Sequence, residues 1–284
     1  MRIANSGSHG FVGSHLFDAL RKEGRHQVKR FDRALHSLAK MESLRSLVAR
    51  QDLIFHLAGA NRASPQELIR VNTLGSLNLL EAIKKYGQEN VGLIFLSSFQ
   101  VYKPAEGKVL ADETWPAEPQ TIYGISKRTA EELIISSGVK SIIFRASNIF
   151  GPGSRPFYNS VIPTFIHLII KGEPLPINGT GQQARDFIYI ADIIDGLQRT
   201  ITHCWEGVKL FNLCSGRPVS VSGLIKGLKK ISQADIAIRN LPALAEKGCL
   251  VGDNRRARKE LGWAPKFTFL EGLKETYQWF RNSR

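Results

Sequence analysis

Short apolar runs alternate with helix-like segments through the first half of the chain. The short runs predict strands, and the segments between them repeat apolar residues at helical spacing. This alternation predicts a parallel sheet covered by helices, and therefore an α/β fold. The strands are expected at residues 2–5, 27–31, 53–57, 92–97 and 141–145, and the helices at residues 13–23, 64–86 and 123–137.

The helix predicted at residues 64–86 has the most complete end signals. Ser64 is placed to be its N-cap, and Pro65 occupies the first helical position. Glu67 stands where it completes a capping box with Ser64. Gly87 follows two lysines and predicts the C-terminal stop.

The texture of the chain changes after Asn148. Glycine- and proline-rich loops, at residues 151–153 and 179–181, alternate there with short apolar segments. We expect a smaller, loop-rich region to begin at this point. The chain shows neither an internal repeat nor a low-complexity linker, so the two regions should pack as one unit.

Length and composition exclude several classes of protein. The 284 residues suffice for one large domain or two smaller ones that share an interface. The apolar stretch at residues 161–170 is about half as long as a membrane span, so no membrane partner is expected. The first strand begins too early for a signal peptide, which predicts a cytoplasmic location. Three cysteines without a CxxC pair predict neither a disulfide framework nor a zinc or other metal site.

The formal charge of +14 favours anionic partners. These include nucleic acid, a membrane surface and small molecules that carry phosphates. The densest basic run, residues 255–259, lies between Asp253 and Glu260, which favours a solvated helix face over a nucleic-acid patch. Nucleic acid is therefore the less favoured partner.

A glycine-rich turn follows the first predicted strand. Gly7, Gly10 and Gly13 allow backbone N–H groups and a helix N-terminus to approach a pyrophosphate without obstruction by Cβ atoms. Asp32 closes the second strand 19 residues after Gly13, near the ~20 expected of an acid that bonds the adenosine ribose. A carboxylate there favours NAD, but the adjacent Arg33 weakens this preference, so NADP is not excluded. Asp32 is alternatively an ordinary turn residue.

A tyrosine, a lysine and a serine form the candidate catalytic set. Tyr123 and Lys127 are four residues apart on a predicted helix and hence share one face. A phenol has a pKa of about 10, and a neighbouring ammonium lowers it by stabilising the phenolate. Ser98 ends the fourth strand at the sheet edge where ligands bind, so its hydroxyl would reach the reacting oxygen. Taken singly, the pair is a common helix-surface feature and Ser98 is a turn serine.

In combination, these motifs resemble the extended short-chain dehydrogenase/reductase family, which contains NAD-dependent sugar-nucleotide epimerases and dehydratases. The resemblance covers essentially the whole chain, and several ordered motifs are more specific than any one of them. It implies a Rossmann-type, doubly wound parallel sheet with a smaller C-terminal substrate-binding region. The motifs lie at residues 7–13, 56–59, 97–102, 123–127, 145–152, 185–192 and 261–265.

The resemblance assigns roles to individual residues. Tyr123 would be the acid/base, Lys127 would lower its pKa and hold the nicotinamide ribose, and Ser98 would polarise the substrate oxygen. Asn148 and Arg185 fall where relatives hold the nucleotide diphosphate, although Asn148 could instead cap a loop and Arg185 could pair with a neighbouring aspartate. The residues expected at the cofactor are Gly7, His9, Gly10, Phe11, Val12, Gly13, Asp32, Arg33, Leu57, Ala58, Gly59, Tyr123 and Lys127.

The resemblance also implies a division of the chain. Residues 1–150 and a returning segment at 186–214 would bind the dinucleotide. Residues 151–185 and 215–284 would bind the substrate, a nucleotide sugar. Relatives often form a homodimer through the helices predicted here at residues 64–86 and 123–137, so a homodimer is expected.

Several reactions fit this set of residues. In a 4-epimerase, Tyr123 removes the proton of the sugar 4-hydroxyl while hydride passes to NAD, and the 4-keto sugar then accepts hydride on its other face. A one-way NAD(P)H-dependent 4-ketoreductase uses the same residues. Dehydratases of the family carry an Asp-Glu pair after the catalytic serine or threonine, whereas this chain has Phe99-Gln100, which disfavours dehydration. A relative that only binds a dinucleotide or RNA is the alternative of another class, and the retained Ser98, Tyr123 and Lys127 argue against it.

Two features depart from the family pattern. Asp52 follows Asp32 after only 20 residues, which predicts that the usual third strand, with its adenine-contacting aspartate, is shortened or lost. The arginine that often holds the diphosphate before the last motif has no clear counterpart at residues 242–252. Lys247 and Arg255 are possible substitutes, and neither is favoured.

Overall fold

The computed structural model describes the whole chain except residues 33, 106, 159, 244–247 and 284. At its centre is a six-stranded sheet in which every neighbouring pair of strands is parallel. In spatial order its strands are β10 (Val208–Leu213), β6 (Ser141–Ala146), β4 (Gly92–Ser98), β3 (Leu53–His56), β1 (Arg2–Asn5) and β2 (Gln27–Arg30).

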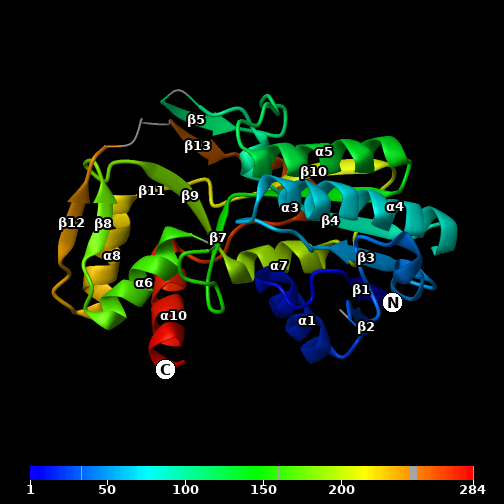
Figure 1. Cartoon of the computed structure of the whole chain (residues 1–284), viewed down its shortest axis with the longest axis horizontal. Coiled ribbons are helices and arrows are strands. Elements are labelled where there is room, and N and C mark those ends of the chain that lie inside the picture. The colour runs from blue at the N-terminus through cyan, green and yellow to red at the C-terminus, as the bar shows by residue number, and fades with distance from the viewer. Residues whose placement is uncertain (33, 106, 159, 244–247, 284) are drawn as a thin grey trace.

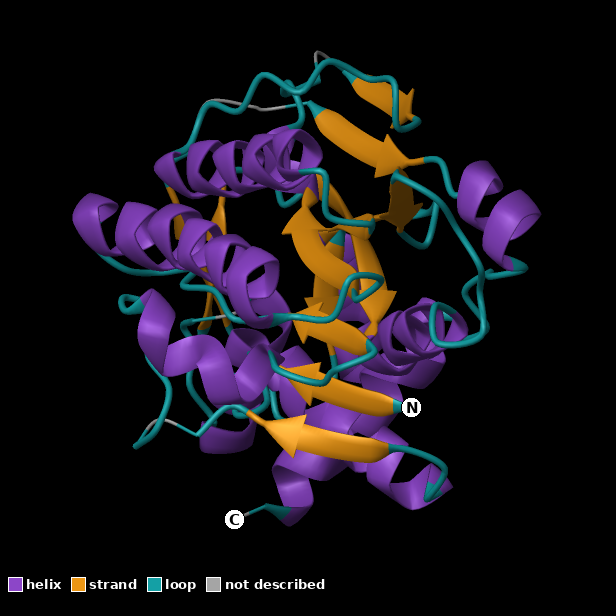
Figure 2. Ribbon diagram, turned by 90° about the vertical axis from the view of Figure 1, so that its right-hand side faces the viewer, coloured by secondary structure: helices purple, strands orange, loops and turns teal. Residues whose placement is uncertain are grey.

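Helices cover both faces of this sheet. The helices α1 (Phe11–Glu23) and α7 (Ile190–Arg199) pack on one face, and α4 (Gly75–Tyr86) and α5 (Ile122–Ser137) lie on the other (Figures 1 and 2). Because side chains alternate along a strand, neighbouring residues enter different cores. Ile3 faces the core under α1, whereas Ala4 faces the core under α4. The predicted α/β, doubly wound parallel fold is confirmed.

The sheet ends at β2, next to β1. After β2 the chain forms the short turns η1 (Met41–Leu44) and α2 (Arg45–Val48) and then enters β3 on the opposite side of β1. Within the part of the chain that the structure describes, no further strand extends the sheet beyond β2. This agrees with the prediction that the usual third strand is shortened or lost.

The helix predicted at residues 64–86 consists of three parts. These are α3 (Pro65–Leu68), a π-helical turn η2 (Ile69–Leu74) and α4. Ser64 caps it as predicted, since its Oγ accepts a hydrogen bond from the Glu67 backbone N–H at 3.2 Å. The predicted capping box is not completed, because the Glu67 carboxylate binds the Arg70 guanidinium instead, at 2.7 and 2.8 Å.

The π turn places two polar side chains against α5. Asn72 Nδ2 donates to Ser126 Oγ at 2.9 Å, and Thr73 Oγ1 donates to the Ser126 carbonyl at 3.1 Å. Asn72 also bonds both the N–H and the carbonyl of Ala60, so it ties α5 to the segment that follows β3. Nothing in the apolar pattern of the sequence predicts this turn.

The second region is built from small sheets and helices beside the main sheet (Figure 1). One sheet orders β11 (Pro218–Ser220), β9 (Ala184–Tyr189) and β7 (Asn148–Phe150), and two further pairs join distant segments. The pairs are β12 (Ile238–Leu241) with β8 (Leu175–Asn178) and β13 (Cys249–Gly252) with β5 (Lys108–Ala111). The remaining helices are η3 (Phe99–Val101), α6 (Val161–Lys171), α8 (Val221–Ser232), α9 (Arg255–Leu261) and α10 (Phe269–Asn282).

Two elements of the main sheet and its helix layers come from late in the chain. Strand β10 pairs with β6, and α7 packs against α1. Among the described residues, no helix combines the length and the apolar character that crossing a membrane requires.

Candidate active site

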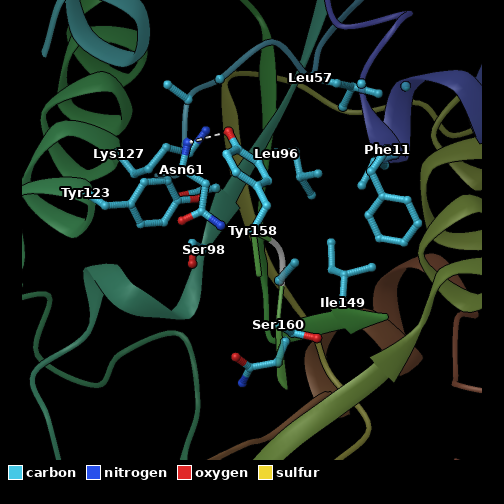
Figure 3. Close-up of a pocket in the computed structure, with 18 of the residues that line it drawn as sticks. Phe11, Leu57, Asn61, Leu96, Ser98, Tyr123, Lys127, Ile149, Tyr158 and Ser160 are labelled. Carbon is cyan, nitrogen blue, oxygen red and sulfur yellow. Dashed lines mark hydrogen bonds between the residues drawn. The ribbon is translucent and has the colours of Figure 1, made fainter. Parts of the chain in front are cut away.

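A cavity of about 410 Å³ opens at the carboxyl ends of β1, β3, β4 and β6 (Figure 3). Its walls come from the glycine turn, the segments after β3 and β4, one face of α5 and residues 146–160. This is the edge at which parallel α/β sheets bind their ligands. The cavity contains all three candidate catalytic residues, Ser98, Tyr123 and Lys127.

The position of Tyr123 and Lys127 follows from how α5 begins. Thr121 is the N-cap, and its Oγ1 accepts a hydrogen bond from the Gly124 backbone N–H at 3.0 Å. Tyr123 and Lys127, one helical turn apart, then face the cavity together. A Cβ atom on Gly124 would lie 2.2 Å from the Gln100 carbonyl oxygen, so glycine allows α5 to approach the end of β4, where Ser98 lies.

Burial controls the ionisation of Tyr123. It raises the pKa of Tyr123 to about 12, while a hydrogen bond with Ser98 opposes this rise and the nearby Tyr158 adds to it. The sequence predicted that Lys127 lowers the pKa of Tyr123, whereas burial raises that pKa in the protein alone, so the role of Lys127 stays a prediction. Tyr123 therefore keeps its proton at neutral pH in the protein alone.

Lys127 is itself shifted by burial. Loss of solvation lowers the pKa of Lys127 to about 7, and the negative charge of Glu131 opposes the change. Its Nζ lies 4.1 Å from the centroid of the Phe95 ring, a cation–π contact with the protonated form. A change in surroundings on ligand binding would therefore change the charge of Lys127 near neutral pH.

A buried ion pair supports this wall of the cavity. Glu131 on α5 accepts hydrogen bonds from Arg145 on β6, the shortest from Nη2 at 2.7 Å. Both side chains are almost fully buried, with exposed fractions of 0% and 3%. The guanidinium of Arg145 also stacks on the Tyr102 ring, 4.6 Å from its centroid. Helix α5 is thereby fixed to the sheet one turn beyond Lys127.

The packing around the turn restricts its three glycine positions to different degrees. A Cβ on Gly7 would lie 2.4 Å from the Leu57 carbonyl carbon, and one on Gly13 would lie 1.9 Å from the Gly7 carbonyl oxygen. Close backbone packing therefore requires glycine at both positions. A Cβ on Gly10 would meet only the Gly7 oxygen, at 3.3 Å, so the protein itself constrains this position least. Gly10 caps α1 without a side-chain bond and faces the cavity.

A second cavity of about 450 Å³ lies on the other side of the glycine turn. The two cavities share His9, Gly10, Leu57 and Gly59 in their walls, so together they form one trough across the turn. The predicted cofactor residues Phe11, Val12 and Gly13 line the first cavity, and Gly7 and Ala58 line the second. A trough with this division suits the two halves of a dinucleotide.

Asp32 lies beside the second cavity without forming its wall. Its carboxylate is exposed and accepts the Ala34 backbone N–H at 2.9 Å, and its own N–H donates to His36 Nδ1. The flanking Phe31 and His36 do line the cavity. Arg33, predicted with Asp32, lies outside the described residues.

The two predicted diphosphate residues are placed differently. Asn148 lines the first cavity, and its Nδ2 donates to the Asp186 carbonyl at 3.0 Å. Arg185 lies on β9 and lines neither cavity, and its Nη1 donates to the Ala184 carbonyl. The structure thus brings Asn148, but not Arg185, to Tyr123.

The sequence offered Lys247 and Arg255 as substitutes for the arginine that often holds the diphosphate. Lys247 lies outside the described residues. Arg255 forms an ion pair with Asp253 at 2.5 Å.

Sequence reasoning missed four polar loop residues that line the first cavity: Asn61, Arg155, Tyr158 and Ser160. They lie in loops whose local pattern carries no signal. Ser160 Oγ is buried without a hydrogen-bond partner among the described residues. A buried polar atom of this kind normally has a partner, so Ser160 indicates a polar ligand.

The cavity also lacks one kind of group. Among the described residues that form its wall, none carries a carboxylic side chain. Elimination of water from a sugar needs an acid and a base beyond the tyrosine. The position of Gln100 in the wall therefore agrees with the prediction that dehydration is disfavoured.

Comparison with known proteins agrees with the family resemblance found in the sequence. The family model described as "NAD dependent epimerase/dehydratase family" matches residues 6–214. The chain is 30% identical over 309 residues to UDP-glucuronic acid decarboxylase 1 of Xenopus tropicalis, an alignment that covers 99% of this chain and 72% of the relative. It is 34% identical over 220 residues to UDP-2-acetamido-2,6-beta-L-arabino-hexul-4-ose reductase of Pseudomonas aeruginosa, covering 76% of this chain and 52% of the relative.

One solved structure extends the similarity to the whole fold. The UDP-glucose 4-epimerase of Thermotoga maritima, solved with UDP-glucose, superposes with a TM-score of 0.89. The two sequences are 28% identical, and the superposition covers 100% of this chain and 99% of the other.

Proposed function

Because the chain belongs to the NAD-dependent epimerase/dehydratase family, we propose that it is a nucleotide-sugar 4-epimerase acting by transient oxidation at C4. Family membership makes the chain an NAD-dependent enzyme of sugar-nucleotide chemistry. The position of the reaction on the sugar is the part that we propose. One observation carries it: Ser98, Tyr123 and Lys127 line the same cavity as the glycine turn.

The residues present fit NAD. The trough crosses the glycine turn, and Gly10 leaves its approach open, as a bound pyrophosphate requires. Ser8 Oγ, within the turn, is buried without a partner among the described residues, which indicates a polar ligand at this position. When bound, NAD accepts a hydride from the sugar and returns it.

The protein supplies orientation and proton transfer. Tyr123 takes the proton of the sugar 4-hydroxyl during oxidation and returns it when the 4-keto group is reduced. Ser98, which hydrogen-bonds Tyr123, holds the same sugar oxygen. Because the pKa of Tyr123 is about 12 in the protein alone, the base form needs a positive charge close to the phenol. Lys127, whose pKa is about 7, would supply that charge in its protonated form.

A 4-ketoreductase is the second candidate. It uses the same three residues and differs in releasing the cofactor after each turnover. The 34% identity to the reductase of Pseudomonas aeruginosa favours it. NADP would then serve as well as NAD if the segment around Asp32 accepts a 2′-phosphate.

A catalytically silent relative that binds a dinucleotide or RNA is the candidate of another class. The complete Ser98, Tyr123 and Lys127 set opposes it, because binding alone does not require a buried phenol beside a lysine. Retention of nucleic acid that falls steeply with salt would show only the attraction expected of a chain with a charge of +14.

We also propose a homodimer and a division of labour along the chain. Helices α4 and α5 lie side by side, and large apolar side chains on this surface are exposed. Residues 151–185 and 215–284 would hold the nucleotide sugar, and Asn148 would contact its diphosphate. A diphosphate contact by Arg185 and a cytoplasmic location stay predictions. The exposed apolar side chains on the surface proposed for the dimer are Leu74, Leu77, Ile122, Ile125 and Ile135.

The deciding experiment incubates the protein with UDP-, dTDP- and GDP-sugars, with and without added NAD(H) or NADP(H). We expect interconversion of C4 epimers without net cofactor consumption. Tyr123→Phe should lower the rate by about 10²- to 10⁴-fold, the range for loss of a general acid/base. Tyr86→Phe, at the end of α4 and away from the cavity, is the matched control.

Other outcomes separate the candidates. Stoichiometric oxidation of NAD(P)H by a 4-keto sugar would identify the reductase. Tight dinucleotide binding without turnover of any sugar would contradict both enzymes and support the silent relative.

A further inference from the structure

The described residues of the loop at 151–160, all except 159, cross the cavity opposite α5. The loop leads from β7 to α6, and hydrogen bonds from outside the loop hold it at three points. His15 Nε2 lies 2.8 Å from the Pro152 carbonyl oxygen, Arg62 Nη1 donates to the Phe157 carbonyl at 3.0 Å, and Thr164 Oγ1 accepts the Phe157 N–H at 2.8 Å. The loop is therefore fixed to both regions of the molecule.

A backbone irregularity turns the next residue inward. Phe157 has a φ of 59°, a left-handed conformation that is uncommon for a residue other than glycine. Its side chain is 58% exposed, whereas the Tyr158 side chain projects into the cavity (Figure 3). Such strain persists where the surroundings hold it and often marks a functional site.

Tyr158 brings a second phenol to the catalytic group. Its hydroxyl lies 3.5 Å from the Asn61 backbone nitrogen, at the outer limit for a hydrogen bond. It is also close enough to Tyr123 to help raise the pKa of that residue. In Figure 3 the two tyrosines enter the cavity from opposite walls, α5 and the loop. The Tyr158 hydroxyl is thus beside the reacting group and poorly bonded.

A second hydroxyl of the same loop also faces the cavity. Ser160 lines it two residues further on, and its buried Oγ has no partner among the described residues. One weak and one missing hydrogen bond on two side chains of the same cavity wall indicate a ligand with several hydroxyl groups. The sugar ring of a nucleotide sugar carries several hydroxyl groups. The nucleotide part of the same molecule gives no reason for hydroxyl partners beside Tyr123.

We infer that Tyr158 is a specificity-determining residue that hydrogen-bonds a ring hydroxyl beside the reacting carbon of the sugar. The inference rests on the proposed function, because it takes the ligand to be a nucleotide sugar. On binding, the sugar hydroxyl replaces Asn61 as the partner of Tyr158. Ser160 then bonds a second polar group of the same ligand.

The experiment compares binding of a nucleotide sugar with binding of its nucleotide. Isothermal titration gives Kd for UDP-, dTDP- and GDP-glucose and for the corresponding nucleoside diphosphates, in the presence of NAD. Tyr158→Phe keeps the ring and removes the hydroxyl. It should weaken binding of the preferred nucleotide sugar by about threefold to tenfold, the effect of one hydrogen bond, and leave binding of the diphosphate and of NAD unchanged.

Matched variants exclude a structural explanation. Tyr86→Phe should change none of these constants, and Ser160→Ala should act in the same direction as Tyr158→Phe. Equal weakening of the sugar nucleotide and the diphosphate by Tyr158→Phe, or no weakening, overturns the inference while the proposed function stands. Failure of the wild-type protein to bind any of the three nucleotide sugars overturns both.

Discussion

The two walls of the catalytic cavity are held in different ways. Helix α5 is fixed by the buried Glu131–Arg145 ion pair and by Asn72, which hydrogen-bonds Ser126. The facing loop at residues 151–160 is partly exposed and is held from outside mainly through hydrogen bonds to its backbone. Buried charge networks resist movement, whereas backbone ties at the surface open at low cost. On the proposed function, the fixed wall would perform proton transfer and the adaptable wall would select the sugar.

The largest effect is expected from a substitution that removes the buried ion pair of the fixed wall. Glu131→Gln leaves the Arg145 guanidinium buried without its countercharge, so the free energy of unfolding should fall by about 3–5 kcal/mol. Glu132→Gln is the matched control on the same helix, because Glu132 is exposed and pairs with Arg128. It should cost less than about 1 kcal/mol in urea denaturation. Equal losses in the two variants would show that the ion pair does not anchor α5.

A smaller effect concerns Lys127 and pH. The unfolded lysine keeps its proton to about pH 10, whereas burial lowers the pKa of Lys127 in the fold to about 7. The unfolded state binds more protons between these values, so this site destabilises the fold most below pH 7 and least above pH 10. Without cofactor, Lys127→Met should stabilise the protein by on the order of 2 kcal/mol at pH 7, less than the shift implies because water enters the cavity.

Thermal unfolding across this pH range checks the sign. The gain from Lys127→Met should shrink toward pH 10, although the variant should be inactive at every pH. His56 and Tyr123 also lie near Lys127, but the pKa of His56 is lowered to about 3 and that of Tyr123 is raised to about 12, so neither titrates between pH 7 and 10. A gain that is independent of pH would contradict the proton-linked origin.

The smallest effect is expected at the adaptable wall. Arg62→Ala removes one of the ties to the loop, the bond to the Phe157 carbonyl. Because Arg62 is exposed, the free energy of unfolding should change by less than about 0.5 kcal/mol. KM for the nucleotide sugar should rise about threefold with kcat unchanged, since one weak hydrogen bond is lost. A change in kcat with constant KM would show that the loop takes part in the chemistry.

Local patterns predicted the elements of the main sheet well. The five predicted strands and three predicted helices exist, and their ends coincide with the prediction or differ from it by one or two residues. The spacing of apolar residues in these elements reflects which of their faces are buried. This spacing can be recognised in a short window of sequence. Pairings such as β5 with β13 were not predicted, because they join segments about 140 residues apart and depend on tertiary contact.

The site shows the same limit. Motifs at fixed spacing predicted the glycine turn, Ser98, Tyr123 and Lys127, and the structure gathers them around one trough. Tyr158 was missed because its role depends on how a loop folds across the cavity. The rise in the pKa of Tyr123 on burial was not predicted, because spacing along a helix does not measure desolvation.

The π turn η2 has a consequence for aligning this chain with its relatives. A π turn closes bonds from residue i to i+5, so it holds about one residue more than an α-helical turn. Deleting one residue between Ile69 and Leu74 would give a regular helix and keep α4 in its orientation relative to α3, whereas a regular helix without the deletion would turn α4 by about 100°. A homologue with a regular helix here should therefore show a one-residue gap inside these six positions. An alignment that puts the gap elsewhere would pair Asn72 with a residue that cannot reach Ser126.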